Sequence, residues 1–307
     1  MQKIKNLVLE IRPLHWIKNL SLFGALIFSG LANIEFYRDI AFLAFVAFCF
    51  ASSATYVFND IIDRSKDQNH PIKKFRPMAA GLVTVPEGLL IIFFTSSMSL
   101  AVANSINHLF TVLIVIYLVL QFFYSLILKK IPILDILIIA SGFVIRVYAG
   151  AIAVNAHLSV WFLLCVVSVA LFLAAGKRRS ELNTALKFAT RNSLERYSKE
   201  LLDSYVTMFG SASWMSWALY TFFESPKASM PLWLTLAEIS KTTTVNKLLM
   251  ITIPLSIFAI MRYQSLIFQE KGEAPEKILL RDIPLLSSVF LWGTIVIFIL
   301  YGGLSFR

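Results

Sequence analysis

Long apolar runs separated by short charged segments dominate this chain of 307 residues. Nine runs are long enough to cross the ~30 Å hydrocarbon core of a bilayer as helices. They lie near residues 19–35, 40–58, 83–103, 107–128, 131–153, 158–176, 204–223, 246–268 and 283–303. The sequence lacks the short alternating segments of a membrane barrel. The pattern therefore predicts an all-α, polytopic membrane protein, a bundle of about nine transmembrane helices that forms one domain over residues 1–307.

The composition supports the membrane class and narrows the functions. Hydrophobic residues make up 58% of the chain and charged residues only 15%, which excludes an ordinary soluble domain. The net charge of +10 does not indicate nucleic acid, because the basic loops carry no interleaved aromatic residues for stacking bases. We attribute it to topology and to anionic membrane lipids. Cys49 and Cys165 both fall inside predicted spans, so neither a disulfide framework nor a zinc site is expected.

The basic residues predict the orientation, because Lys and Arg near span ends stay on the cytoplasmic side. They gather in the segments 3–18, 64–76, 129–130, 177–199 and 271–281. The opposite side has only Arg38, Lys227, Lys241, Lys247 and Arg307. We therefore expect a cytoplasmic N-terminus and, with nine spans, an external C-terminus.

The segment "YVFNDIIDRSKDQNHPIKKFRP", residues 56–77, crowds acids and bases at a predicted cytoplasmic boundary. If the second span continues through it as a helix, Asp60, Asp63 and Asp67 lie within an arc of ~60°. Asn59 adds an amide at the edge of that face. Oxygen ligands of this kind suit Mg²⁺, which bridges carboxylates to phosphate oxygens. The competing interpretation is a solvated charged loop that sets the topology.

Three groups of charged side chains lie at the same predicted boundary. The first group follows the aspartates and consists of Lys73, Lys74 and Arg76. The second lies in "GKRRSEL", residues 176–182, and consists of Lys177, Arg178, Arg179 and Glu181. The third lies in "LKKIPILD", residues 128–135, and consists of Lys129, Lys130 and Asp135. Arg and Lys bind phosphate well, but bases at a cytoplasmic span end are also typical of a topology signal.

Arg146 lies eleven residues beyond Asp135 in the fifth predicted span, at a depth of ~16 Å along a helix. A guanidinium in lipid is costly unless it is paired or faces a polar cavity. Two interpretations stay open: a structural partner inside the bundle, or the inner wall of a substrate cavity.

Several motifs together resemble one family. They are "RPLHWIKN" at 12–19, "NDIIDRSKD" at 59–67, "LDILIIASGFVIRVYAGAIA" at 134–153, "GKRRSEL", and "RYQSLIFQEKGEAPEKILLRD" at 262–282. The sequence resembles the UbiA superfamily of membrane prenyltransferases, and within it the phosphoribosyltransferases that act on polyprenyl phosphates. The resemblance implies Mg²⁺-dependent transfer of 5-phosphoribose from 5-phosphoribosyl 1-diphosphate to a polyprenyl phosphate, with release of diphosphate. It also implies a cytoplasm-facing site in a bacterial inner (plasma) membrane.

The resemblance assigns roles to particular residues. Asp60, Asp63 and Asp67 would be the catalytic, Mg²⁺-binding carboxylates. The expected substrate-binding residues are Lys18, Asn19, Asn59, Lys73, Arg76, Lys129, Lys130, Asp135, Arg146, Lys177, Arg178, Arg179 and Glu181. Aromatic prenyltransferases of the superfamily carry a second aspartate-rich motif where this chain has "KRRSEL". Bases in place of acids favour a substrate with additional phosphate groups.

Two other functions stay open. The first is an aromatic prenyltransferase of the same superfamily that uses an allylic polyprenyl diphosphate. The second is a transporter of lipids or small molecules, although transporters tend to place ionisable groups near the bilayer midplane. The sequence leaves open the acceptor's chain length, the number of metal ions and the oligomeric state, a homo-oligomer included.

Overall fold

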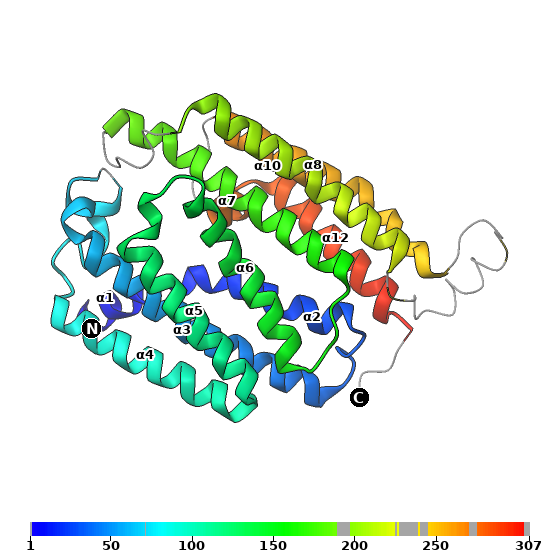
Figure 1. Ribbon diagram of the computed structural model, residues 1–307, viewed down its shortest axis with the longest axis horizontal. Helices are drawn as coiled ribbons and strands as arrows, with labels where there is room; N and C mark the ends of the chain where they lie inside the picture. Colours follow the sequence, from blue (N-terminus) through cyan, green and yellow to red (C-terminus); the bar gives the residue numbers. More distant parts are fainter. Residues whose placement is uncertain are drawn as a thin grey trace.

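The long apolar runs form helices that lie side by side along one direction (Figure 1). The computed structural model describes residues 2–70, 72–188, 197–224, 226, 239, 245–269 and 275–303. The α-helices are α1 (Gln2–Glu10), α2 (Phe23–Phe28), α3 (Glu35–Gln68), α4 (Val85–Ile106), α5 (His108–Leu126), α6 (Leu134–Ala153), α7 (Val160–Phe188), α8 (Lys199–Phe223), α10 (Ile253–Phe268), α11 (Pro275–Arg281) and α12 (Ile283–Tyr301). Four 3₁₀ helices accompany them: η1 (Pro13–Leu22), η2 (Lys73–Phe75), η3 (Leu128–Lys130) and η4 (Val245–Thr252). The prediction of an all-α protein is confirmed.

Seven helices of the described residues are long and apolar enough to cross a membrane, and they match seven predicted spans. The predicted span 19–35 instead contains the end of η1 and the six-residue α2, which ends just before Ser29 and Gly30. The predicted span 204–223 lies within α8, a continuous helix of 25 residues that buries Ser213, Ser216 and Thr221. Nine crossings therefore stay a prediction. Lys227, Lys241 and Arg307, which we expect on the external side, lie outside the described residues.

The central element of the half that carries the candidate site is α3. Five small residues along it are almost fully buried: Ala41, Ala44, Ala47, Ala51 and Ala54. They allow α4, α5, α6 and η1 to pack closely around it. With 34 residues, α3 is ~51 Å long, which exceeds the ~30 Å hydrocarbon core.

Gly150 sets the distance between α6 and η1. A Cβ atom at this position would lie 2.1 Å from the carbonyl oxygen of Leu22, so a larger residue would push η1 away. This close approach lets the N-terminal segment lie inside the bundle, beside the helices that carry the site.

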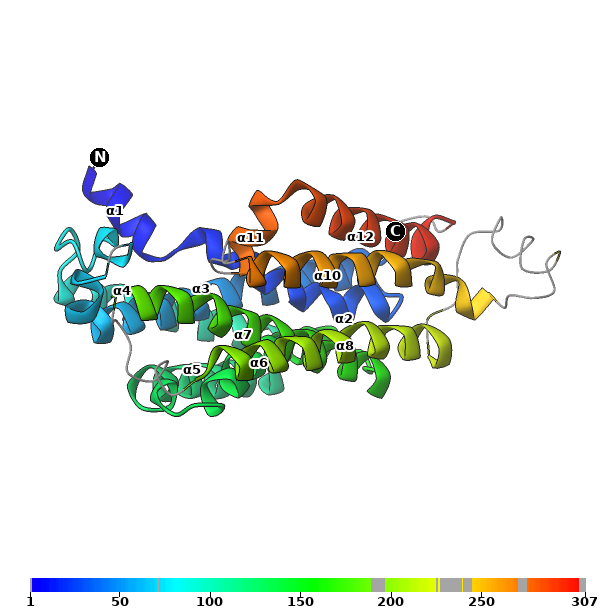
Figure 2. The ribbon, with the colours of Figure 1, turned by 90° about the horizontal axis from the view of Figure 1, so that it is seen from above.

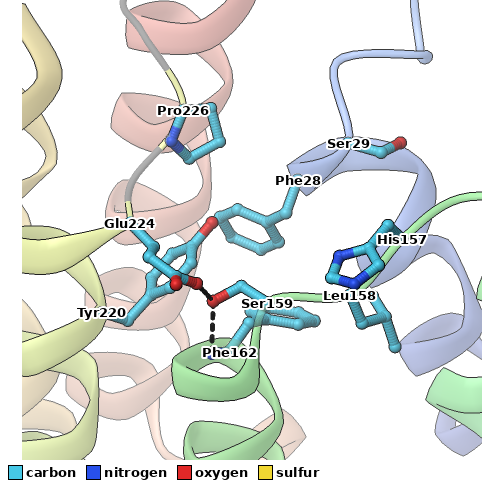
Figure 3. A pocket seen from close by; sticks show the side chains of 9 residues that line it. All are labelled: Phe28, Ser29, His157, Leu158, Ser159, Phe162, Tyr220, Glu224 and Pro226. Atoms are coloured by element: carbon cyan, nitrogen blue, oxygen red, sulfur yellow. Dashed lines mark hydrogen bonds between the residues drawn. The ribbon is translucent and has the colours of Figure 1, made fainter.

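The two ends of the bundle differ in character (Figures 1 and 2). At one end, α1 and the turn after α3 lie next to each other, and this end carries the acids and bases described below. At the other end lie the last turn of α2, the start of α7 and the end of α8. A cavity of about 510 Å³ opens there, with the aromatic rings of Phe28, Phe162 and Tyr220 and the polar side chains of His157 and Glu224 on its wall (Figure 3).

Candidate active site

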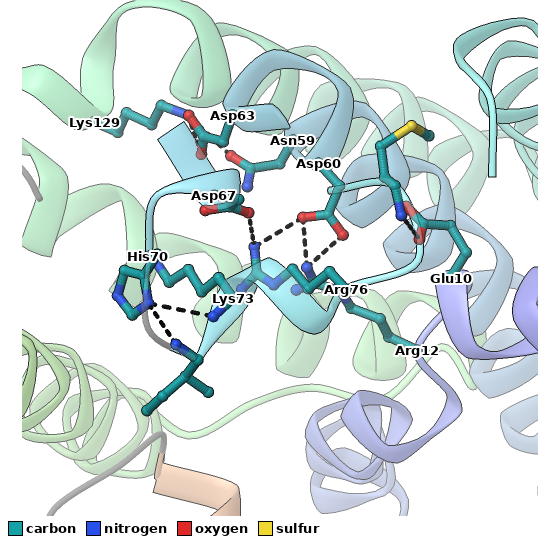
Figure 4. A network of polar contacts seen from close by, with 12 residues as sticks. Glu10, Arg12, Asn59, Asp60, Asp63, Asp67, His70, Lys73, Arg76 and Lys129 are labelled. Atoms are coloured by element: carbon teal, nitrogen blue, oxygen red, sulfur yellow. Dashed lines mark hydrogen bonds and ion pairs between the residues drawn. The ribbon is translucent and has the colours of Figure 1, made fainter. Parts of the chain in front are cut away.

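The last third of α3 carries a cluster of acids and bases (Figure 4). Asp60 is buried, with 2% of its surface exposed, and its carboxylate faces two guanidinium groups. Nη2 of Arg12 donates to both oxygens and lies 2.5 Å from Oδ1, while Nη1 of Arg76 lies 3.0 Å from Oδ1. The same Arg76 nitrogen lies 2.5 Å from Oδ2 of Asp67. One guanidinium therefore bridges two carboxylates that lie two turns apart on α3.

Arg12 reaches Asp60 because the chain turns sharply between α1 and η1. Its backbone lies in the left-handed region, with φ 54° and ψ 61°, which is unusual for a residue before proline. Oγ of Ser53 on α3 donates to the carbonyl oxygen of Ile11 at 2.9 Å, and the indole of Trp16 donates to Ser53 at 3.0 Å. These contacts fasten the turn to α3.

Asp63 faces a different element, the 3₁₀ helix η3. Nζ of Lys129 lies 2.7 Å from both carboxylate oxygens of Asp63 and 3.1 Å from Oδ1 of Asn59. Only 6% of Lys129 is exposed, so this is a largely buried ion pair. The structure thus brings one member of the first predicted group, Arg76, and one of the third, Lys129, to the three aspartates.

The predicted metal site can be compared with these contacts. All three aspartates lie on one helix as expected, but no group of three or more acidic, histidine or cysteine side chains in the described residues is arranged to hold a metal ion. The donors are nevertheless of the kind that Mg²⁺ prefers, because Asp60, Asp63, Asp67 and Asn59 all offer oxygen atoms. In this structure those oxygens pair with Arg76 and Lys129. Metal binding by these residues stays a prediction.

The turn after α3 carries Lys73 and Arg76, and His70 shapes it. Nδ1 of His70 accepts from the backbone N–H groups of Ile72 and Lys73, each at 3.2 Å. Burial, aided by the charge of Lys73, lowers the pKa of His70, which favours the neutral ring that can accept these bonds. The turn then directs Arg76 back toward α3.

Arg178 lies at the centre of a second cluster, where α5, α6 and α7 meet. It is fully buried, and Nε lies 2.6 Å from Oδ2 of Asp135, while Nη2 lies 2.5 Å from the hydroxyl of Tyr124. Nη1 also pairs with Glu181. Tyr197, just before α8, donates to the other oxygen of Asp135 at 2.7 Å. The predicted substrate-binding residues Asp135, Arg178 and Glu181 therefore lie together.

Arg179 points to a different partner, although it is the neighbour of Arg178. Its Nε lies 2.5 Å from Oδ1 of Asp203 on α8, and only 1% of the residue is exposed. Lys177 is partly buried, and Lys130 at the end of η3 is exposed. Contact of these bases with a substrate phosphate stays a prediction.

Arg146 and Asn19 meet deep in the bundle. Nε of Arg146 donates to Oδ1 of Asn19 at 2.7 Å, Nη2 donates to the hydroxyl of Tyr117 at 2.8 Å, and Nη1 donates to the carbonyl of Gly142 at 2.5 Å. Oxygen atoms of the protein therefore accept hydrogen bonds from all three nitrogens of this guanidinium. This agrees with the interpretation of Arg146 as a structural residue inside the bundle. Nζ of Lys18 lies closer to the surface, 3.3 Å from Nδ1 of His15.

Sequence reasoning missed several residues of these clusters. Arg12 counted only as a topology charge, although the motif "RPLHWIKN" begins with it, and Glu10 was not singled out. No sequence motif points to Tyr124, Tyr197 or Asp203. Their hydrogen-bond partners lie 54, 62 and 24 residues away in the sequence.

A bundle of apolar helices with acids and bases gathered at one end suits a membrane protein that binds charged groups at that end. The chain belongs to the UbiA prenyltransferase family, which matches residues 20–179. It is 32% identical over 304 residues to the decaprenyl-phosphate phosphoribosyltransferase of Corynebacterium glutamicum, covering 96% of this chain and 86% of that protein. It is 36% identical over 225 residues to the enzyme of the same name from Mycolicibacterium smegmatis, covering 71% of each chain.

The fold agrees with solved structures of the family. A UbiA homolog from Archaeoglobus fulgidus, bound to GPP and Mg²⁺, superposes with a TM-score of 0.71 at 18% identity and covers 99% of this chain and 100% of that chain. The family and the two phosphoribosyltransferase relatives indicate an integral membrane enzyme that transfers a prenyl or pentosyl group, which favours this class over a transporter.

Proposed function

We propose that the protein transfers 5-phosphoribose from 5-phosphoribosyl 1-diphosphate to a polyprenyl phosphate and releases diphosphate. The observation that supports this proposal most strongly is the sequence similarity to two enzymes named decaprenyl-phosphate phosphoribosyltransferase, one of them over 96% of this chain. The charge of the site supports it, because Arg12, Arg76 and Lys129 surround the aspartates and "KRRSEL" supplies bases elsewhere at the same end. A donor and an acceptor that both carry phosphate suit such a site.

The proposed reaction is a substitution at the anomeric carbon of the ribose. A bond forms between this carbon and an oxygen of the lipid phosphate, and the bond from the carbon to the diphosphate oxygen breaks with its electron pair. The lipid phosphate is already anionic near neutral pH, so the reaction needs no general base. Mg²⁺, when bound by Asp60, Asp63 and Asp67, would neutralise the departing diphosphate as a Lewis acid.

The protein's bases would bind the phosphates. Arg12 and Arg76 lie beside Asp60 and present planar forks that match phosphate oxygens, while Lys129 supplies a point charge beside Asp63. Lys73 and Lys130 would extend this positive surface toward water. The site would face the cytoplasm of a bacterial inner membrane, with α1 on that side.

An aromatic prenyltransferase activity is the second candidate, because the similar structure from Archaeoglobus fulgidus holds GPP and Mg²⁺. The two candidates differ in the donor, so one pair of incubations separates them. Purified protein with Mg²⁺ receives either 5-phosphoribosyl 1-diphosphate and a short polyprenyl phosphate, or GPP and a hydroxybenzoate. Mass spectrometry of the lipid fraction should show a phosphoribosylated lipid in the first incubation only. A prenylated aromatic product without it would overturn the proposal.

A further inference from the structure

Glu10, at the end of α1, is a buried carboxylate that the proposed reaction does not use. Only 1% of its surface is exposed. Oε2 accepts a hydrogen bond from the backbone N–H of Met78 at 3.2 Å, whereas Oε1 is buried and has no hydrogen-bond partner among the described residues. Burying a carboxylate with one unpaired oxygen costs folding free energy, so the presence of Glu10 at this position calls for a local explanation.

The reason lies in what the Glu10–Met78 contact connects (Figure 4). Arg12 lies two residues after Glu10, and Arg76 lies two residues before Met78. These are the two arginines that hold the carboxylate of Asp60. The hydrogen bond therefore ties together the two chain segments that bring guanidinium groups to the aspartate from opposite directions.

The rest of α1 shows that polar contacts hold this helix in place. Its exposed residues include the apolar Ile4 and Val8, 66% and 47% exposed, while its buried residues are the polar Asn6 and Glu10. Nζ of Lys3 lies 2.7 Å from Oε1 of Glu87 at the start of α4.

The two ends of α1 do not contribute equally to its position. At the Lys3 end, the side chains of Lys3 and Glu87 are 51% and 33% exposed, so water screens their ion pair and its contribution is small. The buried Glu10–Met78 contact therefore has the larger part in fixing the helix against the segment that carries Arg76.

We propose that Glu10 is a positioning residue that holds Arg12 and Arg76 in place to bind a diphosphate group beside Asp60. The inference rests on the proposed function only in the choice of diphosphate as the ligand. Glu10 itself does not touch the ligand; it acts through the backbone of Met78 and through the tight turn at Arg12. Burial and the charge of Asp60 raise the pKa of Glu10 to about 7, which agrees with a carboxyl group that serves as a hydrogen-bond acceptor more than as a charge partner.

The test compares Glu10→Ala and Glu10→Gln in the full chain, reconstituted in lipid nanodiscs with Mg²⁺. Glutamine keeps a side-chain oxygen that can accept from Met78, whereas alanine removes it. Glu35→Ala is the matched control, because Glu35 is an exposed carboxylate at the start of α3, far from the site in the sequence. Two readouts are measured: affinity for inorganic diphosphate by calorimetry, and hydrogen exchange of peptides covering residues 76–84.

We expect Glu10→Ala to weaken diphosphate binding about tenfold and to speed exchange in 76–84, because the hydrogen bond from the backbone of Met78 is lost. Glu10→Gln should stay within about threefold of the wild type in both readouts. Glu35→Ala should behave like the wild type. Equal behaviour of Glu10→Ala and Glu35→Ala would overturn the inference, and so would a Glu10→Gln as impaired as Glu10→Ala. Failure of the wild type to transfer phosphoribose would refute the proposed function alone, since neither readout requires turnover.

Discussion

Replacing Arg178 with glutamine should destabilise the protein strongly, because the change leaves a buried carboxylate without its charge partner. Arg178 is fully buried, and Asp135, 2.6 Å from it, has 2% of its surface exposed. Removing one member of a buried ion pair typically costs ~3–5 kcal/mol. At ~2–4 °C per kcal/mol for a chain of this order of size, the melting temperature should fall by roughly 6–20 °C.

The neighbouring arginine supplies the matched control. Arg179 is equally buried, but the carboxylate side chain of its partner Asp203 is 33% exposed. Water can therefore solvate that carboxylate once the guanidinium is gone, and Arg179→Gln should cost only ~1 kcal/mol from the lost pair. The two substitutions are identical in chemistry and adjacent in sequence, so the difference between them reports on the buried Asp135 together with the Tyr124 and Glu181 contacts of Arg178.

The assay is thermal unfolding followed by intrinsic fluorescence, with each variant purified in the same detergent. The double variant Arg178→Gln with Asp135→Asn removes the unpaired charge and should recover at least about half of the lost stability. If Arg178→Gln melts no lower than Arg179→Gln, or if the double variant melts lower than Arg178→Gln alone, the buried pair does not have the role assigned to it.

Three further predictions concern the metal, the pH dependence and the topology. Asp60→Asn and Asp63→Asn should each lower phosphoribosyl transfer roughly a hundredfold or more, and EDTA should abolish it; full turnover in EDTA would exclude the metal. The pKa of Glu10 rises from 4.5 to about 7 on folding, so its contribution to stability is complete below pH 4.5 and is lost as the pH rises through about 7. The unfolding free energy of the wild type relative to Glu10→Gln should therefore fall by up to ~3 kcal/mol between pH 5 and pH 8, and its relative melting temperature should fall with it. Parallel melting curves of the two proteins would contradict the burial of this group. Cysteines placed singly in 64–76 and in 177–182 should be labelled from the same side of the membrane, and labelling from opposite sides would divide the proposed site.

The features that the sequence predicted well are those that depend on one helix at a time. The aspartates share one helix because α3 runs unbroken from its apolar part through Gln68, and seven apolar runs became long helices for the same reason. The run 19–35 failed to form one long helix because the backbone is 3₁₀ through Leu22 and turns at Gly30, where φ is 78°. A hydropathy pattern predicts neither a 3₁₀ backbone nor a glycine with positive φ.

The pairing of acids with bases could not be predicted, because it depends on tertiary contacts. Asp60 meets Arg12 across 48 residues, and Asp63 meets Lys129 across 66. Glu10 shows the same limit: its place in a short amphipathic helix suggests exposure, and only the packing of α1 against the turn at Met78 buries it.

The length of α3 has a consequence for how two substrates of different solubility could meet. Counted from Glu35 at 1.5 Å per residue, Asp60 lies ~37 Å along the helix. If Glu35 marks one edge of the ~30 Å hydrocarbon core, the carboxylate of Asp60 lies past the other edge, at the level of the lipid head groups. A polyprenyl phosphate could present its phosphate at this height while its chain stays dissolved in the bilayer, and a sugar diphosphate could arrive from water without entering the membrane. The helix thus acts as a spacer whose residue count matches the site to the boundary between the two phases, and a four-residue deletion within its membrane-spanning part would lower the carboxylates by ~6 Å into the lipid.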